Sequence, residues 1–173
     1  MSSQANQPLP EGFQLENYRI LRLLSSGGFS FVYLAHDEKE TPVAIKEYLP
    51  TSLVVRGTGG QIELRSSAQS DTFELGRRSF LNEARLLARF DHPSLVKVYR
   101  FWEANQTAYM VMPYYEGITL REARRDMGKP PSEAWLRSLL GPLLGALDVL
   151  HRAQVYHRDI APDNILLLGP NKP

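Results

Sequence analysis

The stretch HRDIAPDN, residues 157–164, is the part of the sequence from which the fold can be inferred. Its first aspartate and its asparagine lie five positions apart, a spacing that suits phosphoryl transfer. Asp159 can accept the proton of an incoming hydroxyl, and Asn164 can reach the Mg²⁺ ion that neutralises charge on the transferring group. The alternative is an ordinary polar turn of aspartate and proline after a helix. Motifs earlier in the chain are needed to choose between the two.

A glycine-containing turn near the start of the chain is the first of these motifs. In LLSSGGFSFVYLA, residues 23–35, Gly27 and Gly28 fall between two expected strands. Such a turn lets backbone N–H groups approach a triphosphate without side chains in the way. An ordinary hairpin turn explains this pattern equally well when it is taken alone.

A lysine and a glutamate complete the set. Lys46 ends the apolar stretch VAIK, residues 43–46, where its ammonium could point toward the α- and β-phosphates or simply into solvent. Glu83 lies in an expected helix and is the suggested ion-pair partner of Lys46, although Glu47 and Glu74 are rival partners. Because the four features occur in a meaningful order, they favour phosphoryl transfer over a chance match.

The hydrophobic pattern predicts an N-terminal region of strands and one helix. Residues 1 to about 16 contain two prolines and polar residues and are expected to be a flexible lead-in. A small hairpin with a glycine-rich centre is expected over 51–66. A helix should begin with a capping box of Asp71 and Glu74 and bury a stripe that includes Phe80 and Ala84. Strands are expected over residues 18–24, 29–37, 41–49, 94–104 and 107–115.

The chain becomes helical after Gly117. Ser132 follows two prolines and can cap a long helix. Pro142 lies inside that helix and should kink it, because proline removes a backbone hydrogen bond. The expected buried stripe consists of leucines: Leu136, Leu140, Leu143, Leu147 and Leu150.

Composition excludes several functional classes. The chain of 173 residues has 20 basic and 19 acidic residues and a formal net charge of +1, so there is no electrostatic reason to expect a nucleic-acid partner. It has no cysteine, which excludes disulfides and cysteine-ligated metals. The N-terminus lacks the pattern of a signal peptide, and no apolar stretch is long enough to span a bilayer. We therefore expect a cytoplasmic location, with any membrane anchor beyond this chain.

Taken together, residues 18–168 resemble the protein-kinase family, particularly the bacterial, eukaryotic-like serine/threonine kinases. The resemblance implies an α+β fold with a five-stranded antiparallel N-lobe, a regulatory helix and a mainly helical C-lobe. The expected divisions are residues 1–16, an N-lobe over 17–115 with an insertion at about 47–70, and an incomplete C-lobe over 116–173.

The family's functional roles transfer to positions that match its motifs. ATP and Mg²⁺ are the implied cofactors. Catalytic roles fall on Lys46, Glu83, Asp159 and Asn164, and Asn164 is also the implied metal ligand. Met112 matches the gatekeeper, and Pro113 keeps the carbonyl that the family uses to bind adenine, although it lacks a donor. The implied nucleotide-binding residues are Leu24, Ser25, Gly27, Gly28, Val32, Ala44, Lys46, Met112, Pro113, Tyr115 and Leu166.

Several positions depart from the family pattern. Ser25 and Ser30 replace two glycines of the loop, so phosphate clamping is expected to be looser or differently shaped. Ala161 stands where serine/threonine kinases usually carry a lysine, and this weakens the assignment of substrate class. The aspartate of the DFG motif is expected just past Pro173, and Arg158 usually pairs with a phosphate of the activation loop that follows. Residues 1–173 alone are therefore expected to be inactive.

The function expected from these motifs is ATP-dependent transfer of the γ-phosphoryl group to serine or threonine hydroxyls of a protein substrate. The alternative is a nucleotide-binding pseudokinase or signalling scaffold, which Ser25, Ser30 and Ala161 would suit. A third alternative, a small-molecule kinase, is disfavoured by Arg158, whose usual partner belongs to protein kinases.

Overall fold

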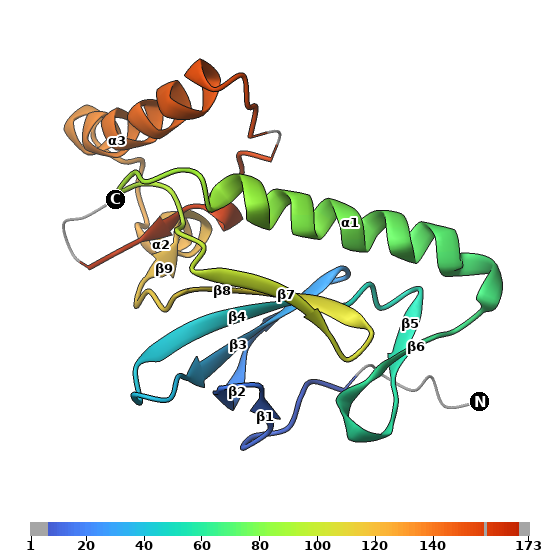
Figure 1. Ribbon diagram of the computed structural model, residues 1–173. Coiled ribbons are helices and arrows are strands. Elements are labelled where there is room, and N and C mark those ends of the chain that lie inside the picture. The colour runs from blue at the N-terminus through green and yellow to red at the C-terminus, as the bar shows by residue number, and fades with distance from the viewer. Residues whose placement is uncertain (1–6, 158, 170–173) are drawn as a thin grey trace. The chain divides into compact units, whose positions relative to one another are not determined.

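The computed structural model describes residues 7–157 and 159–169. The chain forms two compact units, one made of residues 1–89 and 97–114 and the other of residues 90–96 and 115–173. Each unit has its own secondary structure, and each is described separately below (Figure 1).

An antiparallel sheet forms the frame of the first unit. Its strand order is β1-β2-β3-β4-β8-β7, which places β4 in its interior between β3 and β8. The five predicted strands are present, and the two-residue strand β1 extends the sheet at one edge. The predicted strand over 94–104 is shorter than expected and begins only at Arg100. The strands are β1 (Gln14–Leu15), β2 (Tyr18–Ser26), β3 (Ser30–His36), β4 (Pro42–Tyr48), β7 (Arg100–Ala104) and β8 (Thr107–Pro113).

The segment between β4 and the long helix of this unit has its own structure. The predicted hairpin is present, with β5 (Val54–Arg56) antiparallel to β6 (Ile62–Leu64). Two short 3₁₀ helices, η1 (Thr58–Gly60) and η2 (Ser67–Gln69), follow β5 and β6 respectively. The segment between β4 and the long helix therefore has regular secondary structure.

Helix α1 (Ser70–Leu87) buries Phe73, Phe80 and Ala84 on the predicted stripe. The predicted capping box is wrong. The N-cap is Gln69, two residues before Asp71, and no side chain caps the helix. The carboxylate of Glu74 instead pairs with Arg77 at 2.6 Å, one turn along the same helix.

The N-terminal segment is not the flexible lead-in that the sequence predicts. From residue 7 onward it packs on the sheet, with Leu9 and Leu15 only 3% and 2% exposed. The Leu9 amide donates to the Tyr33 hydroxyl, and the Arg56 side chain donates to the Gln7 carbonyl. Proline and polar residues suggested flexibility, but two leucines in this segment gain burial against the sheet, and that outweighs the local pattern.

The two faces of the sheet have different coverings. Side chains alternate along β4, so Ile45 and Glu47 face one way while Lys46 and Tyr48 face the other. The N-terminal segment and the β5–β6 hairpin cover the first face, and α1 packs along the second (Figure 1). This arrangement leaves Lys46 on the side of the sheet that carries α1.

The second unit is mainly helical. Ser132 caps α3 through a bond from the Trp135 amide, as predicted, and the helix continues through Pro142. Its buried stripe is shifted: Leu139, Ala146 and Leu150 are buried, whereas Leu136 and Leu140 are 40% and 50% exposed. Leucines lie on several faces of this helix, so spacing alone could not choose the buried one. The elements are β9 (Ile118–Thr119), α2 (Leu120–Asp126), α3 (Glu133–Arg152), η3 (Pro162–Asn164) and β10 (Leu166–Leu167).

Candidate active site

In the first unit, strand register gathers several of the predicted nucleotide-binding residues on one face. Lys46 of β4 lies opposite Val32 of β3, and Ala44 lies opposite Met112 of β8. Paired residues in an antiparallel sheet project to the same side, so these four side chains share the face that carries α1. The sheet thus provides an apolar surface that ends in a lysine ammonium.

The predicted partner of Lys46 is the one that the structure places beside it. The Lys46 Nζ lies 3.8 Å from the Glu83 Oε1 and 5.8 Å from the centre of the Phe80 ring. The rival candidates are engaged elsewhere, because Glu47 points to the opposite face of the sheet and Glu74 pairs with Arg77. Lys46 and Glu83 thus form an accessible ion pair at the edge of a packed core.

The glycine turn between β2 and β3 is held by backbone bonds to the start of the insertion. The Gly27 amide donates to the Ser30 carbonyl at 2.9 Å. The amides of Leu49 and Thr51 donate to the carbonyls of Phe29 and Gly28, at 2.8 and 3.0 Å. These bonds extend the β3–β4 pairing and fix the turn above the strand that carries Lys46.

The remaining predicted residues of this unit lie at strand ends. The register of β2 against β3 shifts between Leu23 and Ser25, so Leu24 sits at the irregularity, half-buried, while Ser25 pairs with Val32. Pro113 ends β8 opposite Val43. Its nitrogen has no hydrogen to donate, which suits the end of a ladder.

In the second unit, the predicted catalytic aspartate and asparagine are bonded to each other. The Asn164 side-chain amide donates to the Asp159 Oδ2 at 2.9 Å and to the Asp159 carbonyl at 3.0 Å. The Asp159 amide approaches the His157 Nδ1 at 3.4 Å, and the Asn164 amide donates to the Ala161 carbonyl. These bonds close the turn from Asp159 to Asn164, and they use neither the Asp159 Oδ1 nor the Asn164 Oδ1. Arg158 lies outside the described residues.

Helix α2 and strand β9 support this turn. The Arg121 side chain bonds Asp163, and this bond together with the charge of Asp163 raises the pKa of the Arg121 guanidinium. The Leu120 amide donates to the Ile165 carbonyl at 2.8 Å, and β9 pairs with β10 just beyond it. The turn from Asp159 to Asn164 is thus attached at its C-terminal end.

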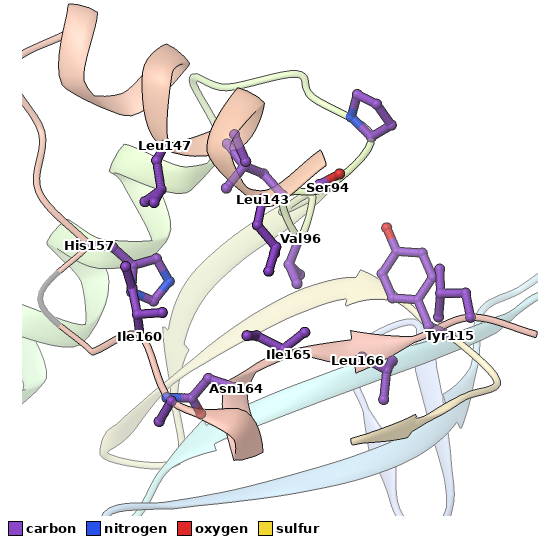
Figure 2. Close-up of a pocket in the computed structure, with 15 residues that line it drawn as sticks. Ser94, Val96, Tyr115, Leu143, Leu147, His157, Ile160, Asn164, Ile165 and Leu166 are labelled. Atoms are coloured by element: carbon purple, nitrogen blue, oxygen red, sulfur yellow. The ribbon is translucent and has the colours of Figure 1, made fainter. Parts of the chain in front are cut away.

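A pocket lies behind the turn, within the second unit (Figure 2). Leu143 and Leu147 of α3 line one side, and Ile165 lines the other. Three predicted site residues also contribute, namely Tyr115, Asn164 and Leu166. The lining is mostly apolar, and the turn contributes the polar side chains of His157 and Asn164 to it.

The oxygen donors of the turn fit a magnesium ion. Because the Asn164 amide nitrogen is committed to Asp159, its oxygen is left as the coordinating atom, and amide and carboxylate oxygens are the ligands Mg²⁺ prefers. Mg²⁺ at phosphoryl-transfer sites is usually held by one or two protein ligands together with substrate phosphates and water. In the part of the chain that the structure describes, this turn included, no three His, Asp or Glu side chains gather into a metal-binding group.

The glycine turn also fits a phosphate group. A Cβ atom at Gly28 would meet nothing within 4 Å, and one at Gly27 would meet only the Ser30 carbonyl oxygen, at 3.7 Å. Neither residue has the positive φ that would require glycine. The fold itself therefore has no need of glycine here, and the open space above the turn can accept a ligand.

Sequence reasoning missed a buried polar cluster on the opposite face of the sheet. Glu47 is fully buried and accepts bonds from Arg56, Tyr33 and Tyr109 at 2.6, 2.7 and 2.9 Å. Burial, with the charge of Glu47 as the next cause, raises the pKa of both tyrosine hydroxyls, which therefore stay protonated and donate. A glutamate within the apolar strand PVAIKEY indicates a buried charge, but the sequence of the strand does not show that its partner is Arg56.

The chain matches the protein kinase domain over residues 18–172. It is 34% identical over 154 residues to the serine/threonine-protein kinase PrkC of Bacillus subtilis, covering 87% of this chain and 20% of that protein. It is 29% identical over 164 residues to the serine/threonine-protein kinase PknD of Chlamydia caviae, covering 88% and 16%. The chain thus spans a fifth or less of the length of these curated relatives.

Solved structures show the same fold. A structure described as "PpkA-294 apo form" is 44% identical, with a TM-score of 0.91, and the match covers 96% of this chain and 59% of that one. The PknI kinase domain of Mycobacterium tuberculosis is 23% identical, with a TM-score of 0.72 over 95% of this chain and 59% of that chain. None of the described helices is both long and apolar enough to cross a bilayer.

Proposed function

Because the chain belongs to the protein kinase family, we propose that it transfers the γ-phosphoryl group of ATP to serine or threonine hydroxyls of a protein substrate. The observation that carries this proposal is the bonded pair Asp159 and Asn164, in which one carboxylate oxygen is held and the other is left to accept a proton. A cytoplasmic location, where ATP is supplied, is part of the proposal.

Each candidate residue has a role in this reaction. Asp159 would orient the substrate hydroxyl and accept its proton as the hydroxyl oxygen attacks. Lys46 would hold the α- and β-phosphates, and Glu83 would keep its ammonium in place. Asn164 would hold Mg²⁺ through its side-chain oxygen, and the ion would neutralise charge that develops on the phosphates. Positioning and electrostatics then supply the catalysis, since little covalent chemistry falls to the protein.

The nucleotide would bind on the face that carries Lys46. Val32, Ala44 and Met112 offer an apolar surface to adenine, together with Leu24 at the β2 irregularity. We also propose nucleotide-binding roles for the carbonyl of Pro113 and, within the second unit, for Tyr115 and Leu166. The Gly28 amide would approach the phosphates, whereas the Gly27 amide closes the turn by bonding the Ser30 carbonyl, and Ser25 lies beside them on β2.

Analysis of the phosphorylated amino acids tests the proposed reaction. The protein in its full natural length should transfer ³²P from γ-labelled ATP with Mg²⁺ to itself or to a general protein substrate. Acid hydrolysis should then recover the label on phosphoserine or phosphothreonine. Label on phosphotyrosine would contradict the proposed substrate class, which Ala161 leaves open in the sequence. Nucleotide binding without any transfer would instead favour the pseudokinase alternative.

Replacing Gly28 by valine is expected to weaken ATP binding without affecting folding. The Cβ position at Gly28 is open, so the larger side chain projects into space that the structure leaves for a ligand. We expect the dissociation constant of an ATP analogue to rise roughly tenfold, a loss equivalent to one well-placed contact, while the melting temperature stays the same. Isothermal titration with an ATP analogue and a thermal melt measure the two quantities.

The matched control for that variant is Gly12→Val, at a glycine outside the proposed site. Gly12 has a φ of +80°, so a side chain there is strained whatever the space around it. This variant should lower the melting temperature and leave the affinity of the folded protein for ATP unchanged. The opposite pattern in the two variants would show that Gly28 serves the fold and not the nucleotide.

A further inference from the structure

Helix α1 approaches β4 so closely at Gly76 that no side chain fits between them. A Cβ atom at Gly76 would overlap the Tyr48 hydroxyl oxygen and would lie 2.9 Å from its Cζ. Non-bonded atoms pack at about 3.5–4.0 Å, so this overlap is strongly repulsive. The φ of Gly76 is not in the left-handed region, and glycine lowers helix stability. The glycine is therefore explained by the close contact and not by backbone conformation.

The Tyr48 ring has little freedom to move aside. It is buried between Phe73 and Phe80, with ring centroids 5.3 and 5.9 Å away. Its hydroxyl donates to the Phe73 carbonyl at 3.3 Å, and its own carbonyl accepts from the Thr107 hydroxyl. Rotation of the ring would disrupt this packing on both sides.

Strand β4 cannot easily give way either. It is paired on both edges, with β3 and with β8, and Tyr48 lies opposite Ser30 in the first ladder. The neighbouring Glu47 is held on the other face by the two-nitrogen contact with Arg56, and the Leu49 amide is bonded to the glycine turn. An added side chain at Gly76 would therefore displace the helix and not the sheet.

Displacement of α1 would act directly on the Lys46–Glu83 ion pair. Gly76, Phe80 and Glu83 are separated by four and three residues, so they lie on one face of the helix. The Lys46 Nζ is already 3.8 Å from the Glu83 Oε1, near the outer limit of an ion pair. A shift of about 1 Å, which relief of the overlap requires, would separate the two charges.

We propose that Gly76 and Tyr48 are positioning residues that set the depth of α1 on the sheet and thereby keep Glu83 within reach of Lys46. The segment between β4 and α1 takes part, because Arg56 holds Glu47 and the Leu49 amide is bonded to the glycine turn. This inference rests on the proposed role of Lys46 in holding the phosphates of ATP. Neither residue would touch the substrate or the nucleotide, so their effect is exerted through the ion pair.

Substitution of Gly76 and Tyr48, singly and together, tests the inference on the protein in its full natural length. Gly76→Ala should lower kcat roughly 10- to 100-fold, the cost of a misplacement of about 1 Å, with little change in KM for the protein substrate. Amide hydrogen exchange in peptides covering 73–87 should become faster. Tyr48→Phe removes the overlapping hydroxyl, so the double variant Tyr48→Phe/Gly76→Ala should recover part of the lost kcat. Tyr48→Phe alone should not raise kcat above that of the wild type. Ser79→Ala, at an exposed position of the same helix, is the control and should match the wild type.

The outcomes separate this inference from the proposed function. A Gly76→Ala variant with normal hydrogen exchange and normal kcat would overturn the positioning role, as would a double variant no more active than Gly76→Ala. Faster exchange in α1 combined with unchanged kcat would show that the helix moves but that the Lys46–Glu83 pair is not needed. That result would overturn the inference and the role proposed for Glu83, and it would leave the role proposed for Lys46 in place. If Gly76→Ala only stabilised the helix, the melting temperature would rise, and the effects of Gly76→Ala and Tyr48→Phe would be additive.

Discussion

Replacing Asp159 by alanine is expected to abolish phosphoryl transfer and to leave nucleotide binding intact. The carboxylate would act on the proton of the attacking hydroxyl, and loss of such a group lowers rates by roughly 10²- to 10⁴-fold. Asp159 lies in the second unit, whereas Lys46 and the glycine turn lie in the first, so the ATP contacts proposed there do not depend on it. The initial rate of ³²P transfer and the dissociation constant of an ATP analogue measure the two effects.

Two controls make that experiment specific. Asp159→Asn keeps an oxygen that can accept the bond from the Asn164 amide, so the turn should be preserved while the base is lost. It should be as inactive as Asp159→Ala. Asp126→Ala removes an exposed carboxylate at the end of α2 and should have normal activity. Transfer at the wild-type rate by either Asp159 variant would rule out the proposed base.

Breaking the pair of Glu47 and Arg56 is expected to cause the largest loss of stability. Both side chains are nearly inaccessible, at 0% and 6% exposure, and removal of one partner leaves a buried charge uncompensated. Such losses cost about 3–5 kcal/mol of the free energy of unfolding. Burial lowers the pKa of Arg56, and the hydrogen bond and charge of Glu47 more than offset this effect. A guanidinium is not deprotonated in proteins, so after Glu47→Ala it would remain charged without its buried partner. Urea unfolding and hydrogen exchange of peptides covering β4 and β5 measure the effect.

An exposed ion pair of the same unit provides the comparison. Arg19 and Glu40 are in contact at 2.9 Å but are 48% and 66% exposed, so solvent screens their attraction. Glu40→Ala should leave the unfolding midpoint unchanged. If Glu47→Ala and Glu40→Ala had equal effects, the buried cluster would not stabilise the insertion against the sheet.

Much of the local structure could be predicted from the sequence because local rules determine it. Ser132 caps α3, and the apolar stripe of α1 buries Phe80 and Ala84, as spacing indicated. The hairpin of the insertion formed where glycines separate two alternating segments. Asp159 and Asn164 meet because they lie five residues apart in one tight turn. These features depend on neighbours within a few residues, which the sequence shows directly.

The failed predictions concern choices among equivalent local patterns. Leucines on several faces of α3 made its buried stripe ambiguous, and the polar N-terminal segment gave no indication that Leu9 would pack on Tyr33. The capping box at Asp71 and Glu74 had the right residue types, but the helix begins at Ser70 after a 3₁₀ turn. For Leu9, packing against residues distant in the sequence outweighed the local preference, whereas the start of α1 was decided by the short 3₁₀ turn before it.

The sequence by itself determined the family motifs, the order of the elements and the candidate catalytic residues Lys46, Asp159 and Asn164. Only the tertiary structure decided which of three glutamates meets Lys46, because that choice depends on how α1 is seated on β4. It also showed that Glu47 is a buried partner of Arg56 and that Gly76 lies against Tyr48, which is 28 positions earlier. Contacts of this kind arise from packing between distant segments, and the residue types alone do not indicate which segments will meet.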